Sequence, residues 1–270
     1  MRVALTIAGS DSTGGAGLQA DLKTFAALGL YGTSVATAIT AQSTVGIVEA
    51  ATLSADLVTA QIEAVAGDIE VHATKTGMLG NAAIVEAVAA AIKELDLPLV
   101  VVDPVLASSR GDRLLDDDGR RMLCAELLPL AHVVTPNIPE AEALSGKLIG
   151  SDDDLKEAAR RIHDMGGAAV LITGGHRSPT TDHRPPEIVD VLFDGRDFLE
   201  FHTPRVESPG THGTGCTFAA AVAAYLALGR PLADAAERAQ RYVAAAIRNQ
   251  LAIGRGQRLL DHFWGGILKE

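Results

Sequence analysis

The sequence predicts an α/β protein built on a mostly parallel sheet. Short runs rich in Val, Ile and Ala alternate along the chain with longer helical patterns, and strands that alternate with helices form parallel sheets. Apolar residues make up 47% of the chain but aromatic residues only 4%, which favours small-residue helices packed on a sheet over an aromatic-rich β-sandwich. A chain of 270 residues can bury a full core without metal or disulfide staples, so we expect one domain over residues 1–270.

Several runs have the pattern of buried strands, and polar or glycine-containing residues follow them closely. These runs are residues 3–8, 34–40, 73–76, 99–103, 132–135 and 168–173. Helical patterns include residues 17–28, 116–128 and 218–228, and Ser54, Asn81 and Ser151 are placed to cap further helices. We expect the ends of the strands to line up along one sheet edge, where open α/β sheets bind ligands.

The stretch after residue 176 departs from this alternation. Residues 177–186 contain three prolines and several polar residues, which predicts a mobile loop and not a domain linker. Two short runs at 188–193 and 198–202 flank an Asp194-Gly195 turn. Together these runs and the turn predict a β-hairpin.

Charge and cysteine content exclude several classes of function. A net charge of −11 argues against nucleic-acid and anionic-membrane partners, because both need a concentrated basic face. The two cysteines, Cys124 and Cys216, lie far apart in the sequence and indicate neither a disulfide framework nor a zinc site. Residues 1–8 have the pattern of a buried strand and not of a signal peptide, and no apolar run approaches membrane-spanning length. We therefore expect a cytoplasmic protein.

The most informative segment is Gly-Thr-Gly-Cys-Thr at residues 213–217, just before an alanine-rich helix. Gly213, Thr214 and Gly215 can turn their N–H groups toward one anion, and the positive end of the helix dipole adds attraction. The sequence thus predicts an anion hole for phosphate. Cys216 falls in the first turn of this helix, where the dipole lowers the pKa of a thiol and favours a proton acceptor. The alternative for Cys216 is a small buried core residue.

A second glycine-rich segment follows the first strand, at residues 9–17. Such a loop also occurs in dinucleotide-binding folds, but the acidic residue expected about 20 positions later is missing. We therefore expect the loop, including Gly9, to face a substrate. Asp21 on the following helix and Gln42 at the end of the second strand can point into one crevice and suit the polar edge of a substrate, because a carboxylate accepts hydrogen bonds and an amide both donates and accepts them. Taken singly, each is better explained as a cap or surface residue.

These two segments, together with Lys75-Thr-Gly-Met-Leu and Thr135-Pro-Asn-Ile-Pro-Glu, resemble the motifs of ribokinase-like kinases. The likeness is to the branch of vitamin kinases that phosphorylate hydroxymethylpyrimidine, in which Cys often replaces Asp at the position of Cys216. It extends from residue 3 to about residue 265, with the motifs in the proper order.

The resemblance implies a three-layer α/β/α fold with a small β-lid, in which Cys216 is the catalytic base. Met78 and Val105 would cover a substrate ring from the same side, while Asn137, Glu140 and Thr173 would serve the nucleotide. Asn137 and Glu140 would organise Mg²⁺, and they can act through water because Mg²⁺ keeps several waters.

The implied reaction is the transfer of phosphate from ATP, with Mg²⁺, to 4-amino-5-hydroxymethyl-2-methylpyrimidine. Members of the family often phosphorylate the monophosphate as well, giving the diphosphate used in thiamine synthesis. A homodimer is common among them, and we expect one here.

The sequence departs from the family pattern at two places. Many relatives have Lys at the positions of Thr173 and Ser108, and Arg110 is the nearest substitute for the second charge. These departures keep a noncatalytic pyrimidine-sensing module as an alternative. A pyridoxal or pyridoxamine kinase is the closest enzymatic alternative, since the same fold phosphorylates a hydroxymethyl group on a pyridine ring. A sugar kinase fits less well, because that branch has Asp at the position of Cys216.

Overall fold

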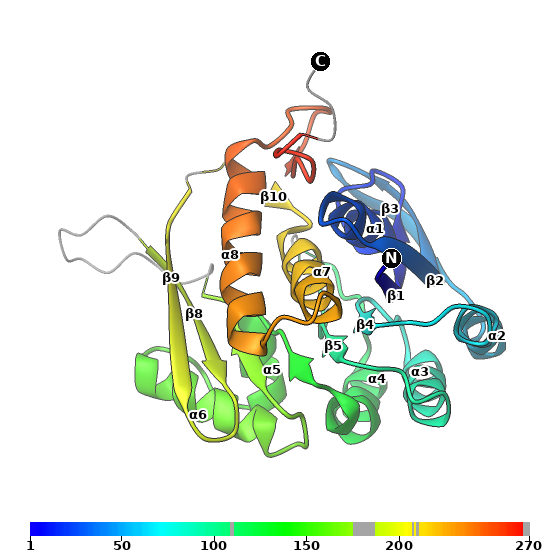
Figure 1. Ribbon diagram of the computed structural model, residues 1–270, viewed down its shortest axis with the longest axis horizontal. Helices are drawn as coiled ribbons and strands as arrows, with labels where there is room; N and C mark the ends of the chain where they lie inside the picture. The colour runs from blue at the N-terminus through cyan, green and yellow to red at the C-terminus, as the bar shows by residue number, and fades with distance from the viewer. Residues whose placement is uncertain (109–110, 175–186, 207, 209–210, 267–270) are drawn as a thin grey trace.

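The computed structural model describes residues 1–108, 111–174, 187–206, 208 and 211–266. Within these ranges a nine-stranded sheet runs through the molecule in the order β3-β2-β1-β4-β5-β6-β7-β8-β9 (Figure 1). The six central strands, β2, β1, β4, β5, β6 and β7, are parallel to one another. At one edge β3 pairs with β2 in antiparallel orientation, and at the other edge β8 and β9 are also antiparallel to their neighbours. This confirms the α/β class and the mostly parallel sheet.

The elements have the following bounds. The strands of the main sheet are β1 (Val3–Asp11), β2 (Tyr31–Ser43), β3 (Gly46–Thr52), β4 (Ala73–Thr76), β5 (Val100–Val102), β6 (Val133–Val134), β7 (Val170–Ile172), β8 (Glu187–Phe193) and β9 (Phe198–Pro204). A separate pair is formed by β10 (Thr211–His212) and β11 (Arg258–Leu259). The α-helices are α1 (Gly17–Ala27), α2 (Ala55–Ala66), α3 (Ala82–Glu94), α4 (Asp117–Met122), α5 (Ile138–Ser145), α6 (Asp152–His163), α7 (Thr214–Ala227) and α8 (Leu232–Arg248).

Helices cover both faces of the sheet, so the fold has three layers. Alternate residues of β1 point to opposite faces: Leu5 and Ile7 pack in a core with α2, α3, α5 and α6, whereas Ala4 packs in a second core with α1, α7 and α8. Figure 1 shows α7 and α8 side by side over the second face. The arrangement is the ribokinase-like α/β/α architecture that the motifs implied.

The alanine-rich composition has a structural reason in α7. All residues from Phe218 to Ala224 in this helix are buried, and six of the seven are Ala or Val. Small side chains let α7 lie close to the sheet while α1 and α8 pack against its flanks. The same helix begins at the glycine-rich segment, so this packing fixes the position of its first turn.

Several local predictions are confirmed. The side chains of Ser54, Asn81 and Ser151 accept hydrogen bonds from the first turns of α2, α3 and α6. The predicted hairpin is β8–β9. The predicted loop at 177–186 lies outside the described residues. No helix in the described ranges is long and apolar enough to cross a bilayer.

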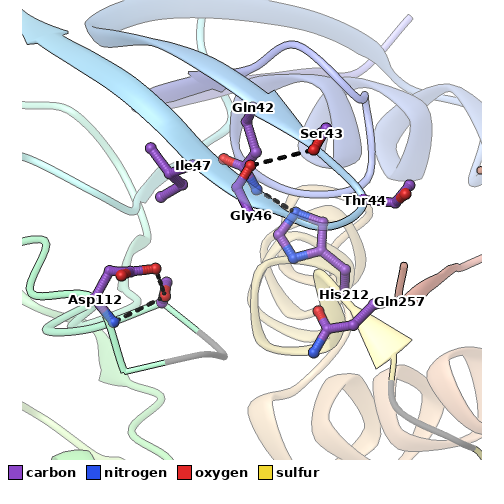
Figure 2. A pocket seen from close by; sticks show the side chains of 9 residues that line it. Gln42, Ser43, Thr44, Gly46, Ile47, Asp112, His212 and Gln257 are labelled. Atoms are coloured by element: carbon purple, nitrogen blue, oxygen red, sulfur yellow. Dashed lines mark hydrogen bonds between the residues drawn. The ribbon is translucent and has the colours of Figure 1, made fainter. Parts of the chain in front are cut away.

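Two local predictions need correction. The helix expected at 116–128 is α-helical only in α4; it continues as a π-helical turn over Leu123–Leu127 and ends in a 3-10 turn over Leu128–Leu130. Pro129 lies in that last turn and has no N–H to extend an α-helix. The sequence also did not reveal β3, an exposed antiparallel strand that forms a hairpin with β2. This hairpin is continuous with the main sheet, and its tip lies near His212 (Figure 2).

The strand order changes direction between β1 and β4. The chain leaves β1 for β2 on one side and returns through α2 to β4 on the other. In open α/β sheets, ligands bind in the crevice at such a switch point, beyond the carboxyl ends of the strands. Gly9, near the end of β1, and Met78, just after β4, therefore lie where a ligand is expected.

We predict that Ala221→Leu, which places a large side chain at a fully buried position of α7, lowers the free energy of unfolding by about 1–3 kcal/mol through overpacking. Urea unfolding measures this change. Ala90→Leu, on an exposed position of α3, is the matched control and should change stability by no more than about 0.5 kcal/mol. Equal effects of the two substitutions would contradict the close packing of α7 on the sheet.

Candidate active site

The Asp11 carboxylate organises the glycine-rich loop after β1. It accepts hydrogen bonds from the backbone N–H groups of Thr13, Gly15 and Ala16 and from the Thr13 hydroxyl. His212 Nε2 lies 2.8 Å from Asp11 Oδ2. Burial works against the charged form, but these partners outweigh it and lower the pKa of Asp11. Asp11 is therefore a carboxylate at neutral pH and ties the loop to the segment before α7.

The two glycine-rich segments touch through their backbones. Gly213 has φ +85°, and a Cβ at this position would lie 1.8 Å from the Gly15 carbonyl oxygen. Gly17 has φ +56°, and its Cβ would lie 2.2 Å from the Gly9 carbonyl oxygen. Only glycine allows both the left-handed backbone and these close approaches. The predicted anion hole at Gly213, Thr214 and Gly215 thus sits at the start of α7, directly against the N-terminal loop.

Gln42 and His212 meet at the tip of the β2–β3 hairpin. Gln42 Nε2 lies 2.9 Å from His212 Nε2, and Thr40 Oγ1 donates to Gln42 Oε1 at 3.2 Å. Figure 2 shows the Gln42 amide directed at the His212 ring, with Gln257 from the C-terminal segment beside it. The hydrogen bond from Thr40 orients the Gln42 amide before any ligand arrives. Contact of Gln42 with a substrate stays a prediction.

The apolar residues predicted for the ring lie at neighbouring strand ends. A Cβ on Gly9 would lie 3.0 Å from Met78 Sδ, so the thioether covers the Gly9 backbone. Val105 follows β5, which is the parallel neighbour of β4. Met78 and Val105 are both half-buried. The structure thus places Gly9, Met78 and Val105 along one stretch of the sheet edge.

A buried ionic cluster lies beneath this edge. Lys75 Nζ is 3.0 Å from Asp21 Oδ2 and 3.6 Å from Asp103 Oδ2, and the side chains of Lys75 and Asp21 are completely buried. Thr6 Oγ1 donates to Asp21 Oδ2 at 2.6 Å. The structure therefore places Asp21 below the surface of the cleft and in an ion pair. Its direct contact with an exocyclic amine stays a prediction.

Cys216 lies in the first turn of α7, as predicted, and its thiol reaches the ionic cluster. The thiol hydrogen-bonds the Asp103 carboxylate, and the backbone N–H of Gly17 donates to the sulfur. The prediction that the helix terminus lowers the thiol pKa is wrong in direction. Burial, together with the negative charges of Asp103 and Asp21, raises the pKa of Cys216 to about 12, although Lys75 opposes the rise. The thiol is protonated at neutral pH.

The residues predicted for the nucleotide follow β6 and β7. Asn137 and Thr173 form a parallel bridge, and Thr173 N–H donates to the Pro136 carbonyl at 2.9 Å. Asn137 caps α5 by accepting from Glu140 N–H, while Glu140 Oε2 accepts from Asn137 N–H. The structure thus shows Asn137 as the N-cap residue of α5. It also brings all three residues together at one place on the sheet edge.

Glu140 has the chemistry that a hard cation needs. Burial and the nearby Asp103 charge raise its pKa to about 8, and a divalent cation would favour its charged form. In the described part of the chain no three acidic, His or Cys side chains form a metal-binding group. Mg²⁺ is usually held by one or two carboxylates together with substrate phosphates and water. Asn137 and Glu140 therefore fit Mg²⁺ contacted through water and do not form an all-protein cage.

The two departures from the family pattern are uncharged here. Ser108 Oγ donates to Asp112 Oδ2 at 2.8 Å, which closes a turn beside the tip of the β2–β3 hairpin. Thr173 is fixed by its backbone contacts with Pro136 and Asn137. Arg110, the expected substitute charge, lies outside the described residues. Neither of the two described positions therefore supplies a cation.

Sequence reasoning assigned no role to Asp11, Lys75, Asp103 or His212. All four nevertheless belong to the site as the structure shows it. A usable signal existed for Asp11 and Asp103, because each is a carboxylate at the end of a buried strand. For Lys75 the sequence argued against burial, since a lysine is rarely buried within a strand unless it is paired.

We predict that Gly213→Ala lowers the free energy of unfolding by about 2–4 kcal/mol, the sum of left-handed strain and a clash with the Gly15 carbonyl. Gly215→Ala is the matched control in the same motif, because nothing lies within 4 Å of its added Cβ. It should be neutral or slightly stabilising. Chemical denaturation of both variants tests this, and similar losses would refute the Gly213–Gly15 contact.

Comparison with known proteins places the chain in one family. A family model described as phosphomethylpyrimidine kinase matches residues 11–261. The hydroxymethylpyrimidine/phosphomethylpyrimidine kinase of Bacillus subtilis is 46% identical over 260 residues, which cover 96% of this chain and 94% of that protein. The thiamine biosynthesis bifunctional protein ThiED of Geobacter sulfurreducens is 49% identical over 258 residues, and the chain spans only 51% of its length.

Solved structures give the same result. A phosphomethylpyrimidine kinase from Clostridium difficile matches with a TM-score of 0.80 and 40% identity, covering 92% of this chain and 100% of that one. The pyridoxal kinase from Staphylococcus aureus in complex with ADP matches with a TM-score of 0.88 and 35% identity, covering 100% and 96%. With these matches along nearly its whole length, the chain belongs to the phosphomethylpyrimidine kinase family.

Proposed function

We propose that this chain transfers the γ-phosphoryl group of ATP, with Mg²⁺, to the hydroxymethyl group of 4-amino-5-hydroxymethyl-2-methylpyrimidine. It would then phosphorylate the resulting monophosphate to the diphosphate. We further propose that residues 1–270 act as one catalytic domain, as a homodimer in the cytoplasm. Relatives covering nearly all of the chain are named for both kinase steps, which supports the two-step reaction.

One observation carries the proposal: the start of α7 lies between the two groups of predicted ligand-binding residues. Gly9 lies near the end of β1, and Met78 and Val105 follow β4 and β5, whereas Asn137 and Thr173 follow β6 and β7. The Cys216 thiol contacts Asp103 at the end of β5, at the boundary between them. A hydroxyl bound on the first side and a phosphate bound on the second would therefore meet at α7.

The residues of the cleft have distinct tasks in this reaction. The start of α7 would receive the charge that builds on the transferred phosphoryl group, because its N–H groups and dipole favour an anion. Met78 and Val105 would hold the ring flat, and Gln42, oriented by Thr40, would select its polar edge. Mg²⁺ would neutralise charge on the phosphates near Asn137 and Glu140. Positioning and electrostatics dominate because the transition state of phosphoryl transfer is generally loose.

A pyridoxal kinase is the second candidate, and a specific observation favours it. The pyridoxal kinase from Staphylococcus aureus in complex with pyridoxal matches this structure with a TM-score of 0.87, 35% identity and coverage of 100% of this chain. Both substrates carry a hydroxymethyl group on a flat ring, so the same cleft geometry suits either one. The polar edge read by Gln42 is what would distinguish them. The sensing module remains the nonenzymatic alternative.

We predict that Cys216→Ala lowers kcat by about 100-fold or more, the usual contribution of proton transfer by a side chain. KM for the pyrimidine should change by no more than about threefold, because the thiol moves a proton and does not hold the ring. Steady-state kinetics with an ADP-release assay measures both. Cys124→Ala, at the other half-buried cysteine, is the control and should keep wild-type kinetics. Equal losses in kcat and binding would contradict the proposed role of Cys216.

We also predict that the pyrimidine and its monophosphate are turned over with a higher kcat/KM than pyridoxal, pyridoxamine or ribose. The measurement is ADP release across this panel, with products identified by mass. Preference for pyridoxal would keep the fold and chemistry but replace the substrate. Saturable binding of the pyrimidine without ADP release would replace the enzyme with the sensing module.

A further inference from the structure

The hydrogen bond between Cys216 and Asp103 determines where a proton can go in this site. We propose that Asp103 takes the proton released by the substrate hydroxyl, that Cys216 passes this proton on, and that Lys75 positions Asp103 to receive it. The inference rests on the proposed kinase function and deepens it, since it names the group at which the proton ends. In this scheme Cys216 touches the substrate, whereas Asp103 and Lys75 act through it.

The geometry supports a relay and not a single base. Asp103 follows β5 directly and is 4% exposed, so its carboxylate is shielded from bulk water. The Cys216 thiol donates to it, and Lys75 Nζ lies 3.6 Å from Asp103 Oδ2. Among the described residues, Asp103 Oδ2 has no hydrogen-bond partner. A buried carboxylate that accepts from the catalytic thiol, and that still has one oxygen without a hydrogen bond, is placed to take up a proton.

The relative acidities of the two groups favour the same direction. The pKa of Cys216 is raised to about 12, so the sulfur is protonated at neutral pH. A protonated thiol cannot keep a second proton. Burial and the Asp21 charge raise the pKa of Asp103 to about 6, which leaves it ionised at neutral pH yet far more basic than an exposed aspartate. A proton from the hydroxyl can therefore be taken up only if the thiol proton moves to Asp103.

The proposed step balances in atoms and charge. The substrate oxygen attacks the γ-phosphorus, a P–O bond forms, and the bond to the leaving ADP breaks. The hydroxyl proton moves to the sulfur of Cys216 while the thiol proton moves to Asp103. The sulfur ends as a thiol, as it began, and Asp103 ends protonated. Release of that proton to solvent after product departure restores the starting state.

The titratable groups around Asp103 come from four elements. Lys75 on β4 lowers its pKa and Asp21 on α1 raises it, while the thiol on α7 lowers it by donation. The charge of Asp103 in turn raises the pKa of Glu140 on α5. Lys75 is the cation of this group, and its ammonium also pairs with Asp21 at 3.0 Å. It thereby keeps Asp103 available as a carboxylate near neutral pH.

The first test separates a relay from a single thiolate base by using Asp103→Asn in a Cys124→Ser background. Removing the Asp103 charge lowers the thiol pKa, so iodoacetamide should alkylate Cys216 about 10-fold faster at pH 8. At the same time kcat should fall about 100-fold or more, with KM within about threefold. A more reactive thiol with a lower turnover is expected only if the proton must reach Asp103. Wild-type kcat in the variant would overturn the proposal.

The second test uses Cys216→Ser, which does not depend on the folding of an Asp103 variant. A hydroxyl can pass a proton between two oxygens, although it is a far weaker base than a thiolate. The relay therefore predicts that kcat of Cys216→Ser is at least about 10-fold above that of Cys216→Ala. Equal kcat values for the two variants would overturn the proposal.

The pH profile gives a third test. In the wild-type protein kcat should fall as the pH drops below about 6, because a protonated Asp103 cannot accept. Lys75→Met should move this limb to higher pH and slow alkylation of Cys216, since the cation no longer favours either anion. Asp190→Asn is the matched control: it removes another buried carboxylate with a pKa raised to about 6, and alkylation of Cys216 should stay at the wild-type rate. An unmoved limb in Lys75→Met would exclude the role given to Lys75.

Failure of the kinase proposal is distinguishable from failure of the relay. If the wild-type protein turns over pyridoxal and not the pyrimidine, only the substrate assignment is lost, and the same variants are compared with pyridoxal. If it releases ADP with neither substrate, both proposals are overturned. If it turns over the pyrimidine and the Asp103 and Cys216 variants behave as a single-base mechanism requires, the relay alone is overturned.

Discussion

The ion pair of Lys75 with Asp21 and Asp103 is the interaction on which the cleft depends. It joins three elements that meet only through tertiary structure: α1, β4 and the end of β5. Two buried carboxylates without a cation would repel each other in a poorly solvated interior, and at least one would become neutral. With Lys75 between them, both strand ends and the first helix are held in one arrangement. The Cys216 thiol on α7 joins this group by donating to Asp103.

Close backbone contacts align the two loops that enclose the site. Gly213 lies against the Gly15 carbonyl, and Gly17 lies against the Gly9 carbonyl. Asp11 then binds the loop N–H groups and faces His212. The start of α7 consequently cannot move relative to the N-terminal loop without breaking several contacts. Such preorganisation matters in phosphoryl transfer, where the protein contributes mainly by position and charge.

The sequence predicted the parts of this site that depend on local pattern. Strand ends, helix caps and the location of Cys216 in a first helical turn all follow from residues within a few positions of each other. The pKa of Cys216 did not follow, because its neighbours Asp21 and Asp103 are distant in the sequence and only the fold shows the desolvation. The ion pair of Asp21 was missed for a similar reason: its partner Lys75 is 54 positions away. The β3 strand was not predicted, because most of its residues are exposed and its sequence shows no alternation of apolar and polar residues.

Stability alone gives a weak reason for burying two carboxylates and an ammonium at the sheet edge. A buried ion pair can often be replaced by apolar residues of similar volume without loss of stability, because desolvation offsets much of the Coulomb attraction. The cluster here is also imperfectly satisfied, since Asp21 Oδ1 and Asp103 Oδ2 have no hydrogen-bond partner among the described residues. Local rules are most often broken at functional sites. The position of this cluster directly beneath the start of α7, in contact with the Cys216 thiol, therefore argues that its charges act in the movement of a proton and not only in holding the fold.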